Sequence, residues 1–116
     1  MRYVADPNQL VGEELSAVCF VRDYVEFRFD GPILRAVTPA TMTADGRSWT
    51  QTDGGYRNTL CSVIGQTVTW VEVDDAERIA FRFDGGAEIV IQDEHASPSG
   101  ESVHFLPALG GALQVW

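Results

Sequence analysis

The pentapeptide Phe-Arg-Phe-Asp-Gly occurs twice in this chain of 116 residues, at 27–31 and again at 81–85. Similar sequence precedes both copies, because LVGEEL at 10–15 aligns with VIGQTV at 63–68. The offset of 53 between these segments becomes 54 at the pentapeptide, after one inserted residue. Self-similarity of this kind indicates two diverged copies of one supersecondary unit. We place the copies at about 6–38 and 53–92, followed by C-terminal strands.

A short helical segment is expected to open each copy. In the first, Asp6 can cap a turn that begins at Pro7 and ends before Gly12, since these residue types are preferred at those positions. In the second, apolar residues spaced i, i+4, i+7 and i+8, preceded by Asp53 as the cap, predict the one real helix of the protein at 55–64.

Strands follow each helical segment, at 15–22 and at 67–73, where β-branched and aromatic residues are frequent. In the next strand of each copy, alternation places three apolar side chains on one face, Val25, Phe27 and Phe29 in the first copy and Ile79, Phe81 and Phe83 in the second. We expect these faces to form the core. Glu26 and Arg28, or Ala80 and Arg82, then lie on the opposite face.

The register of the second hairpin follows from its turn. With Asp84-Gly85-Gly86 as a three-residue loop, Phe83 faces Ala87, and the pairs further along are Phe81 with Ile89 and Ile79 with Ile91. The same register sets Arg82 across from Glu88 as an opposite-charge pair.

The first hairpin allows two registers. Copying the register of the second hairpin puts Arg35 opposite Phe27 on the core face, as a buried functional residue. A four-residue loop at 30–33 instead turns Leu34 and Ala36 inward and Arg35 outward. We favour the longer loop because an unpaired guanidinium is costly to bury, and whether Arg35 is buried stays open.

These patterns predict one mainly β domain over 1–116, built from two related units of a short helix plus three strands. Further short strands are expected at 41–43 and 48–51, and two closing strands at 102–106 and 112–116. The sheets should be antiparallel and form a sandwich or a half-open barrel that buries both Phe faces. An α+β fold with one antiparallel sheet is the alternative.

Composition limits the classes of partner. The net charge is −9, and all eight basic residues are Arg, so the chain repels nucleic acid and acidic membrane surfaces and attracts basic proteins. No apolar run is long enough to span a bilayer, and the N-terminus lacks the apolar stretch of a signal peptide. We expect a cytoplasmic protein in which Cys19 and Cys61 are reduced and buried, and a homodimer is left open.

Candidate binding residues are acidic or lie in the last strands. Asp74, Asp75 and Glu77 form a charged turn, Glu101 opens a late strand, and His104 lies on the face opposite Val103 and Phe105. Arg57 is a further polar residue of interest. Trp49, Tyr56 and Trp70 form either a contact patch or part of the core.

Motifs of catalysis and of cofactor or metal binding are missing. No serine stands in a nucleophile elbow, neither cysteine adjoins a histidine, and no phosphate-binding loop with its lysine occurs. The two cysteines and two histidines lack the spacing of a zinc site. We therefore predict no cofactor, no metal and no catalytic residue.

The second half resembles a group of short acidic bacterial proteins that carry a domain of unknown function. The resemblance covers mainly 63–116 and is carried by four segments: Gly65-Gln66-Thr67-Val68, the Phe-x-Phe-x-x-Gly hairpin at 81–86, the Gly-Glu-x-x-x-Phe segment at 100–105 and the terminal Trp116. The proline that usually separates the glycine and glutamate of the third segment is absent here. The resemblance implies no activity.

Three classes of function remain. The first is a non-catalytic bacterial interaction domain, such as an immunity-like acidic inhibitor of a basic partner, because steering charge is present without catalytic motifs. The second is a small-ligand-binding protein with a pocket inside a half-open barrel. The third is an enzyme whose motif escapes detection.

Overall fold

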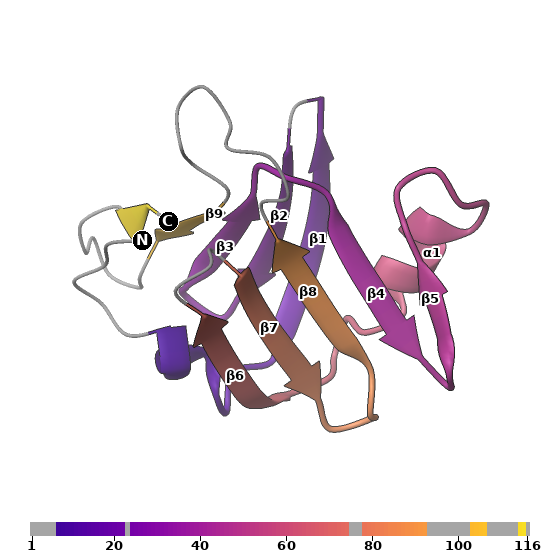
Figure 1. Cartoon of the computed structure of the whole chain (residues 1–116). Coiled ribbons are helices and arrows are strands. Elements are labelled where there is room, and N and C mark those ends of the chain that lie inside the picture. The colour runs from indigo at the N-terminus through magenta and orange to yellow at the C-terminus, as the bar shows by residue number, and fades with distance from the viewer. Residues whose placement is uncertain (1–6, 23, 75–77, 93–102, 107–113, 116) are drawn as a thin grey trace.

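Two five-stranded antiparallel sheets make up most of the fold. The computed structural model describes residues 7–22, 24–74, 78–92, 103–106 and 114–115. One sheet has the strand order β1-β2-β3-β9-β10 and the other β5-β4-β8-β7-β6 (Figure 1). The strands are β1 (Leu15–Val21), β2 (Tyr24–Phe29), β3 (Ile33–Ala36), β4 (Ala40–Ala44), β5 (Arg47–Trp49), β6 (Val68–Asp74), β7 (Arg78–Phe83), β8 (Glu88–Gln92), β9 (Val103–Leu106) and β10 (Gln114–Val115). The mainly β, antiparallel, sandwich-like fold expected from the sequence is confirmed.

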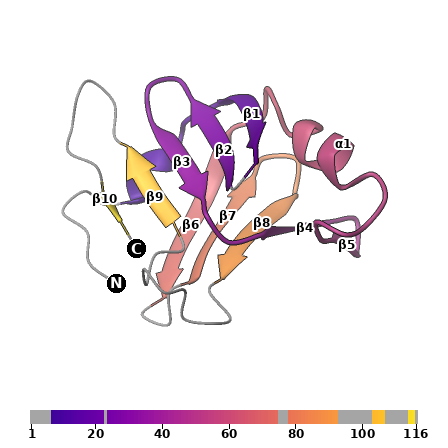
Figure 2. The ribbon, with the colours of Figure 1, turned by 90° about the horizontal axis from the view of Figure 1, so that it is seen from above.

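The order of elements repeats along the chain. A helical segment and five strands, from the 3-10 helix η1 (Pro7–Leu10) to β5, are followed by the helix α1 (Tyr56–Cys61) and five more strands to β10. Each sheet contains three strands of one half and the last two strands of the other. Figure 2 shows β9 beside β3, while β4 leads away from β3 toward the other sheet. The structural repeat thus extends beyond 38 and 92, to the strand pairs that follow.

Reciprocal backbone hydrogen bonds join the two halves where β1 and β6 begin. The Gly12 and Gly65 amides donate to the carbonyls of Val68 and Leu15, both at 2.8 Å. The Val68 and Leu15 amides donate to the carbonyls of Glu13 and Gln66, both at 2.9 Å. Every bond has its partner at the offset of 53 found in the sequence, and Glu14 faces Thr67 at the centre. A pseudo-twofold axis therefore passes between Glu14 and Thr67.

The irregularities of the two halves also match. The register of β1 against β2 shifts between Leu15 and Ala17, and that of β6 against β7 shifts between Val68 and Trp70. A bulge at the same place in both halves increases the local twist of each sheet in the same way. The helical segments follow this symmetry too, since η1 packs on β6 and α1 packs on β1.

The second hairpin has the register that its turn predicts. Phe81 faces Ile89, Ile79 faces Ile91, and Arg82 faces Glu88. The Arg82 Nε donates to Glu88 Oε2 at 2.7 Å, and the Arg82 guanidinium also lies 4.2 Å from the ring centroid of Trp70.

The first hairpin differs from both expected registers. Phe27 faces Leu34 and Arg28 faces Ile33, so the loop is the two residues Asp30 and Gly31 and not the four residues 30–33. Gly31 has a φ of 112°, which glycine alone adopts readily, and this allows the tight turn. The expected orientation holds nevertheless, because Leu34 and Ala36 are buried in the core and Arg35 faces Glu26 on the outer side.

Both phenylalanine rows lie in one core. The ring of Phe81 contacts those of Phe27, Phe29 and Phe83 at centroid distances of 5.6, 6.4 and 5.7 Å, all close to edge-to-face. Phe27 and Phe81 have no exposed surface. The aromatic residues of the two repeated pentapeptides therefore hold the two sheets together.

Helix α1 is shorter than predicted, and Asp53 does not cap it. The Asp53 carboxylate instead accepts a hydrogen bond from the Thr50 amide at 2.7 Å. Gly55, at a φ of 85°, takes the N-cap position, and no side chain caps the helix. Tyr56 and Leu60 are buried, and the Tyr56 hydroxyl donates to the Ala40 carbonyl at 2.7 Å. Tyr56 thus belongs to the core, Trp49 is partly buried against it, and Trp70 packs under Arg82, so the three do not form one patch.

The shared core predicts that Phe27→Ala and Phe81→Ala each lower the free energy of unfolding by about 3–5 kcal/mol, because truncation of a buried Phe leaves a cavity. Urea denaturation of the purified variants measures the loss. Val21→Ala serves as control, since Val21 is 43% exposed and its truncation should cost less than about 0.5 kcal/mol. A parent-like midpoint for either Phe variant would contradict the shared core.

Candidate functional site

The structure does not gather the predicted binding residues into one described site. Asp74 ends β6 opposite Arg78, whereas His104 lies in β9 of the other sheet, opposite Arg35. Asp75, Glu77 and Glu101 lie outside the described residues, as does Trp116. Three other features of the surface can be described in full: a charged row on one sheet, an acidic end and a pocket at the opposite end.

The charged row crosses the outer face of the sheet that contains β1. Glu26, only 4% exposed, accepts hydrogen bonds from two forked guanidinium groups. Arg28 Nη2 and Nε bind Oε1 at 2.9 and 3.2 Å, and Arg35 Nη2 and Nε bind Oε2 at 2.8 and 3.0 Å. The backbone of His104 in β9 pairs with that of Arg35, and the Arg35 guanidinium lies 4.7 Å from the ring centroid of Tyr24.

Electrostatics keep the Glu26 carboxylate ionised. Burial raises its pKa, but the hydrogen bonds and charges of Arg28 and Arg35 outweigh burial and leave the pKa below its ordinary value. Such a carboxylate cannot serve as a general acid near neutral pH. Glu26 is thus the shared acceptor that holds the two guanidinium groups of the row.

The other sheet keeps an arginine, Arg82, at the place of Arg28 but has no charge at the places of Glu26 and Arg35. By register, Ala80 and Val90 stand there instead, and Ala80 is fully buried. The fold can therefore be built with apolar residues at these two positions. The sequence pattern places Glu26 on the face opposite the core and does not reveal its burial. The signal that could have found it is an acidic residue with one arginine two places further on, Arg28, and another across the turn, Arg35.

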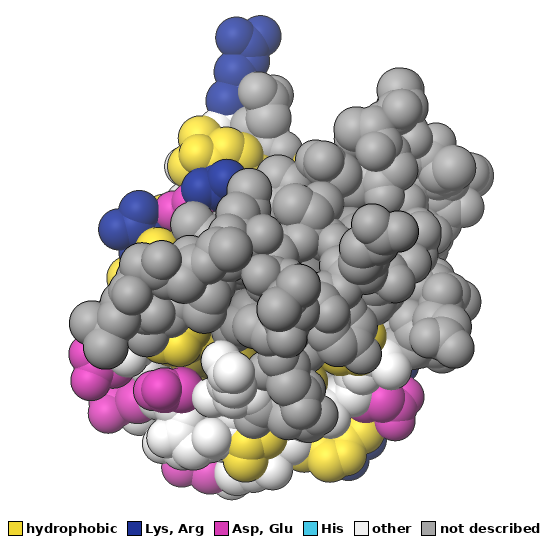
Figure 3. All heavy atoms as spheres, turned by 90° about the vertical axis from the view of Figure 1, so that its left-hand side faces the viewer, with side chains coloured by type: hydrophobic (Ala, Val, Ile, Leu, Met, Phe, Trp, Pro, Cys, Tyr) yellow, Lys and Arg dark blue, Asp and Glu magenta, His cyan; other side chains and the backbone are white. Residues whose placement is uncertain are grey.

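The acidic end lies at the pseudo-twofold axis. Glu13 and Glu14 precede β1, Asp30 stands in the β2–β3 turn, and Asp84 stands in the β7–β8 turn. Within the described part of the chain, none of these four carboxylates makes an ion pair, in contrast to Glu26, Glu72 and Glu88. Figure 3 shows acidic side chains along the lower rim of one face, on the side of the molecule where Figure 1 places the β7–β8 turn.

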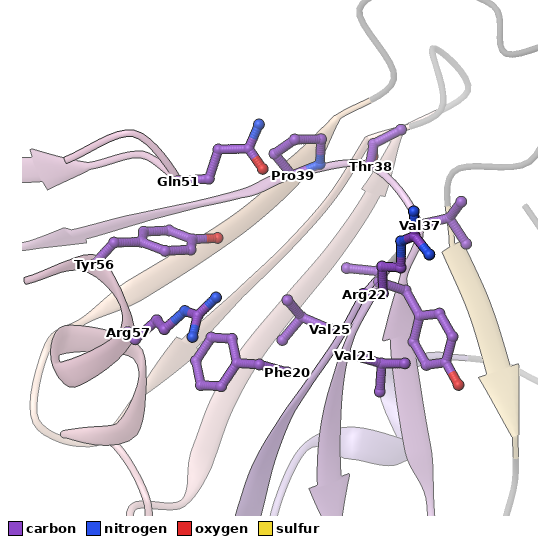
Figure 4. A pocket seen from close by; sticks show the side chains of 12 residues that line it. Phe20, Val21, Arg22, Val25, Val37, Thr38, Pro39, Gln51, Tyr56 and Arg57 are labelled. Carbon is purple, nitrogen blue, oxygen red and sulfur yellow. The ribbon is translucent and has the colours of Figure 1, made fainter. Parts of the chain in front are cut away.

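A pocket of about 220 Å³ opens at the other end of the sandwich. It is lined by the last residues of β1, the first of β2, the connection from β3 to β4, and α1. Figure 4 shows Phe20 and Val25 on one side and Tyr56 and Arg57 of α1 on another, below Gln51 and Pro39. Arg57 and Tyr56, both singled out from the sequence, thus line a concave site. The remaining lining residues were not predicted because they come together only in the fold.

Comparison with known proteins gives no relative. No protein-family model matches the chain, and no curated protein or solved structure matches it. The resemblance of the second half to a group of bacterial proteins stays a prediction.

Among the described residues, no three potential metal ligands cluster, and no described helix is long and apolar enough to cross a membrane. Cys19 and Cys61 are unbonded and only half-buried, which corrects the expectation that they are buried.

The charged row predicts a pH-dependent stability. Because the pKa of Glu26 is lower in the folded state, its stabilising effect is complete above the unfolded value of about 4.5 and is lost as the pH falls through the folded value. Glu26→Gln should lower the free energy of unfolding at pH 7 by about 1–3 kcal/mol. The difference from the parent should shrink below pH 4.5, as measured by urea denaturation across pH.

Glu72→Gln is the matched control, because Glu72 forms an exposed pair with Arg78 at 3.4 Å and its loss should cost less than about 0.5 kcal/mol at any pH. A Glu26→Gln deficit that stays constant from pH 7 to pH 3 would show that the ionised carboxylate is not what stabilises the row.

Proposed function

We propose that this protein is a non-catalytic bacterial interaction domain that binds a basic protein partner through its acidic end, in the manner of an immunity-like inhibitor. One observation carries the proposal. Acidic residues outnumber arginines by 17 to 8, and the carboxylates at the axis make no ion pair within the described residues, so their charge is available to a partner. Free carboxylates on one end of a molecule attract a basic surface and orient it during encounter.

Apolar side chains stand beside this acidic end. Val11 and Ile64, 46% and 42% exposed, occupy equivalent positions directly before the two glycines that bond across the axis. Of the three large hydrophobic residues exposed in the described part of the chain, two therefore flank the axis. An apolar contact with a charged surround is the usual composition of a protein interface. Both halves of the repeat would then contribute to one binding surface.

A cytoplasmic location is part of the proposal. Cys19 and Cys61 are both unbonded, and free thiols are the normal state of cysteine in a reducing compartment. A cytoplasmic inhibitor would meet its basic partner at an ionic strength that screens charges beyond about 8 Å. The acidic end would therefore act mainly on the last steps of approach.

The proposal predicts a charge-dependent association rate. After the partner is captured by pull-down from the source organism at low salt, surface plasmon resonance would compare the parent with Glu14→Gln/Asp30→Asn. The variant should associate several-fold more slowly at low salt, with dissociation nearly unchanged, because long-range charge acts on encounter. The difference should decrease as salt is added.

Two comparison variants locate the surface. Asp53→Asn/Glu72→Gln makes the same change in net charge at exposed positions outside the acidic end, one in the loop before α1 and one in β6, and should leave the association rate nearly unchanged. Asp74→Asn/Asp75→Asn/Glu77→Gln removes the charged turn predicted from the sequence. If only this triple variant slows association, the partner binds at that turn and not at the axis. If association is indifferent to all variants and to salt, the charge does not serve binding.

A further inference from the structure

The pocket opposite the acidic end combines aromatic and aliphatic side chains with two arginines. Phe20 and Val25 come from the core-facing side of the first sheet, and Tyr56 comes from α1. Arg57 lies beside Tyr56, with its guanidinium 5.3 Å from the ring centroid of Phe20. In Figure 4 the guanidinium groups of Arg57 and Arg22 stand on opposite sides of the pocket. A ligand in the pocket would lie between two cations and against aromatic rings.

Neither of these two arginines is neutralised by a described carboxylate. Four arginines form ion pairs, namely Arg28, Arg35, Arg78 and Arg82. Across the ranges that the structure describes, Arg22 and Arg57 have no carboxylate partner, and the described lining of the pocket contains no Asp or Glu. In a chain of net charge −9, carboxylates are abundant, yet none of the described ones neutralises this pair. Two guanidinium groups that line one concave site without a described counter-charge favour an anion as its ligand.

Tyr56 adds an uncharged aromatic wall to the pocket. The Tyr56 hydroxyl is already bonded to the Ala40 carbonyl, and burial raises the pKa of Tyr56, so the ring stays neutral. Tyr56 therefore offers an apolar wall and adds no negative charge.

The size of the pocket limits the body of the ligand. A cavity of about 150 Å³ holds one benzene molecule, so the 220 Å³ here has room for one ring and a carboxylate. A guanidinium binds carboxylates in a planar fork, and the rings of Phe20 and Tyr56 in the lining favour a ligand with a flat apolar ring of its own. We propose that this pocket binds a small carboxylate with a flat apolar body, of the size of benzoate or phenylacetate.

This binding site is independent of the proposed interaction surface. The pocket and the acidic end lie at opposite ends of the strands, because β1 begins at the axis and its last residues line the pocket. Loss of ligand binding would leave partner binding unaffected, and the reverse also holds. The two proposals therefore fail separately.

The test is a titration of the purified full chain, labelled with ¹⁵N, with benzoate and phenylacetate, and separately with benzamide as the neutral counterpart of benzoate. At least one carboxylate should shift the amide signals of Phe20, Val25 and Arg57 in a saturable way, with a dissociation constant of about 1 mM or tighter. Benzamide should bind at least about tenfold more weakly, because it lacks the charge that the arginines bind.

Arginine variants test whether Arg57 and Arg22 are the groups that bind the carboxylate. Arg57→Gln and Arg22→Gln should each weaken binding of the carboxylate several-fold, and both side chains are exposed, so the fold should be retained. Arg47→Gln is the matched control, because Arg47 also lacks an ion pair within the described residues but lies over Trp49 in β5, outside the pocket lining. This control should bind as the parent does.

Three results would overturn the proposal. The first is the absence of saturable shifts with both carboxylates up to about 20 mM. The second is equal binding of benzoate and benzamide by the parent chain, a comparison that needs no variant to fold. The third is a loss of affinity in Arg47→Gln as large as in Arg57→Gln, which would indicate a general effect of charge.

Discussion

The reciprocal backbone bonds between Gly12–Leu15 and Gly65–Val68 are the constraint on which the rest of the structure depends. They fix the two halves antiparallel at one point, so that each half presents its phenylalanine row to the other. The strands of both sheets then run away from this point, which makes the axis one end of the molecule and leaves a pocket at the other. The exchanged strand pairs join the halves again further out, with β4 beside β8 and β9 beside β3.

Symmetry also shows where the two halves have diverged. The core positions remain alike, since Phe27 and Phe81 both carry the packing between sheets. The outer faces differ, because Glu26 is ion-paired in one sheet while Ala80 occupies its place in the other. A buried ion pair is a weak source of stability compared with apolar packing of similar volume. We therefore expect selection for function to have acted at the positions where the two halves differ in polarity.

Local patterns in the sequence were sufficient for the second hairpin and for both phenylalanine faces. Alternation and turn chemistry act within a few residues, and here they agree with the fold. The predicted loop of the first hairpin was wrong, because Gly31 permits a two-residue turn that local sequence patterns do not distinguish from a longer one. The predicted helix cap at Asp53 was wrong for a similar reason, since the Thr50 amide binds the Asp53 carboxylate in place of the helix amides.

The site was less predictable than the fold. Arg57 was noticed, but its neighbours Phe20 and Thr38 come from distant segments that only the strand exchange between halves brings together. The burial of Glu26 likewise depends on two arginines that reach it from the same strand and from the next. Such relations depend on long-range packing, on which local periodicity carries no information.

Native-state amide hydrogen exchange tests the central claim, that two equivalent halves are held about one axis. The account predicts that the amides of Gly12, Leu15, Gly65 and Val68, which donate across the axis, are all strongly protected, with equivalent positions in the two halves protected to a similar degree. The Glu14 amide, for which the described structure shows no acceptor, should exchange much faster. Rapid exchange of the four bonded amides, or protection confined to one half, would contradict it.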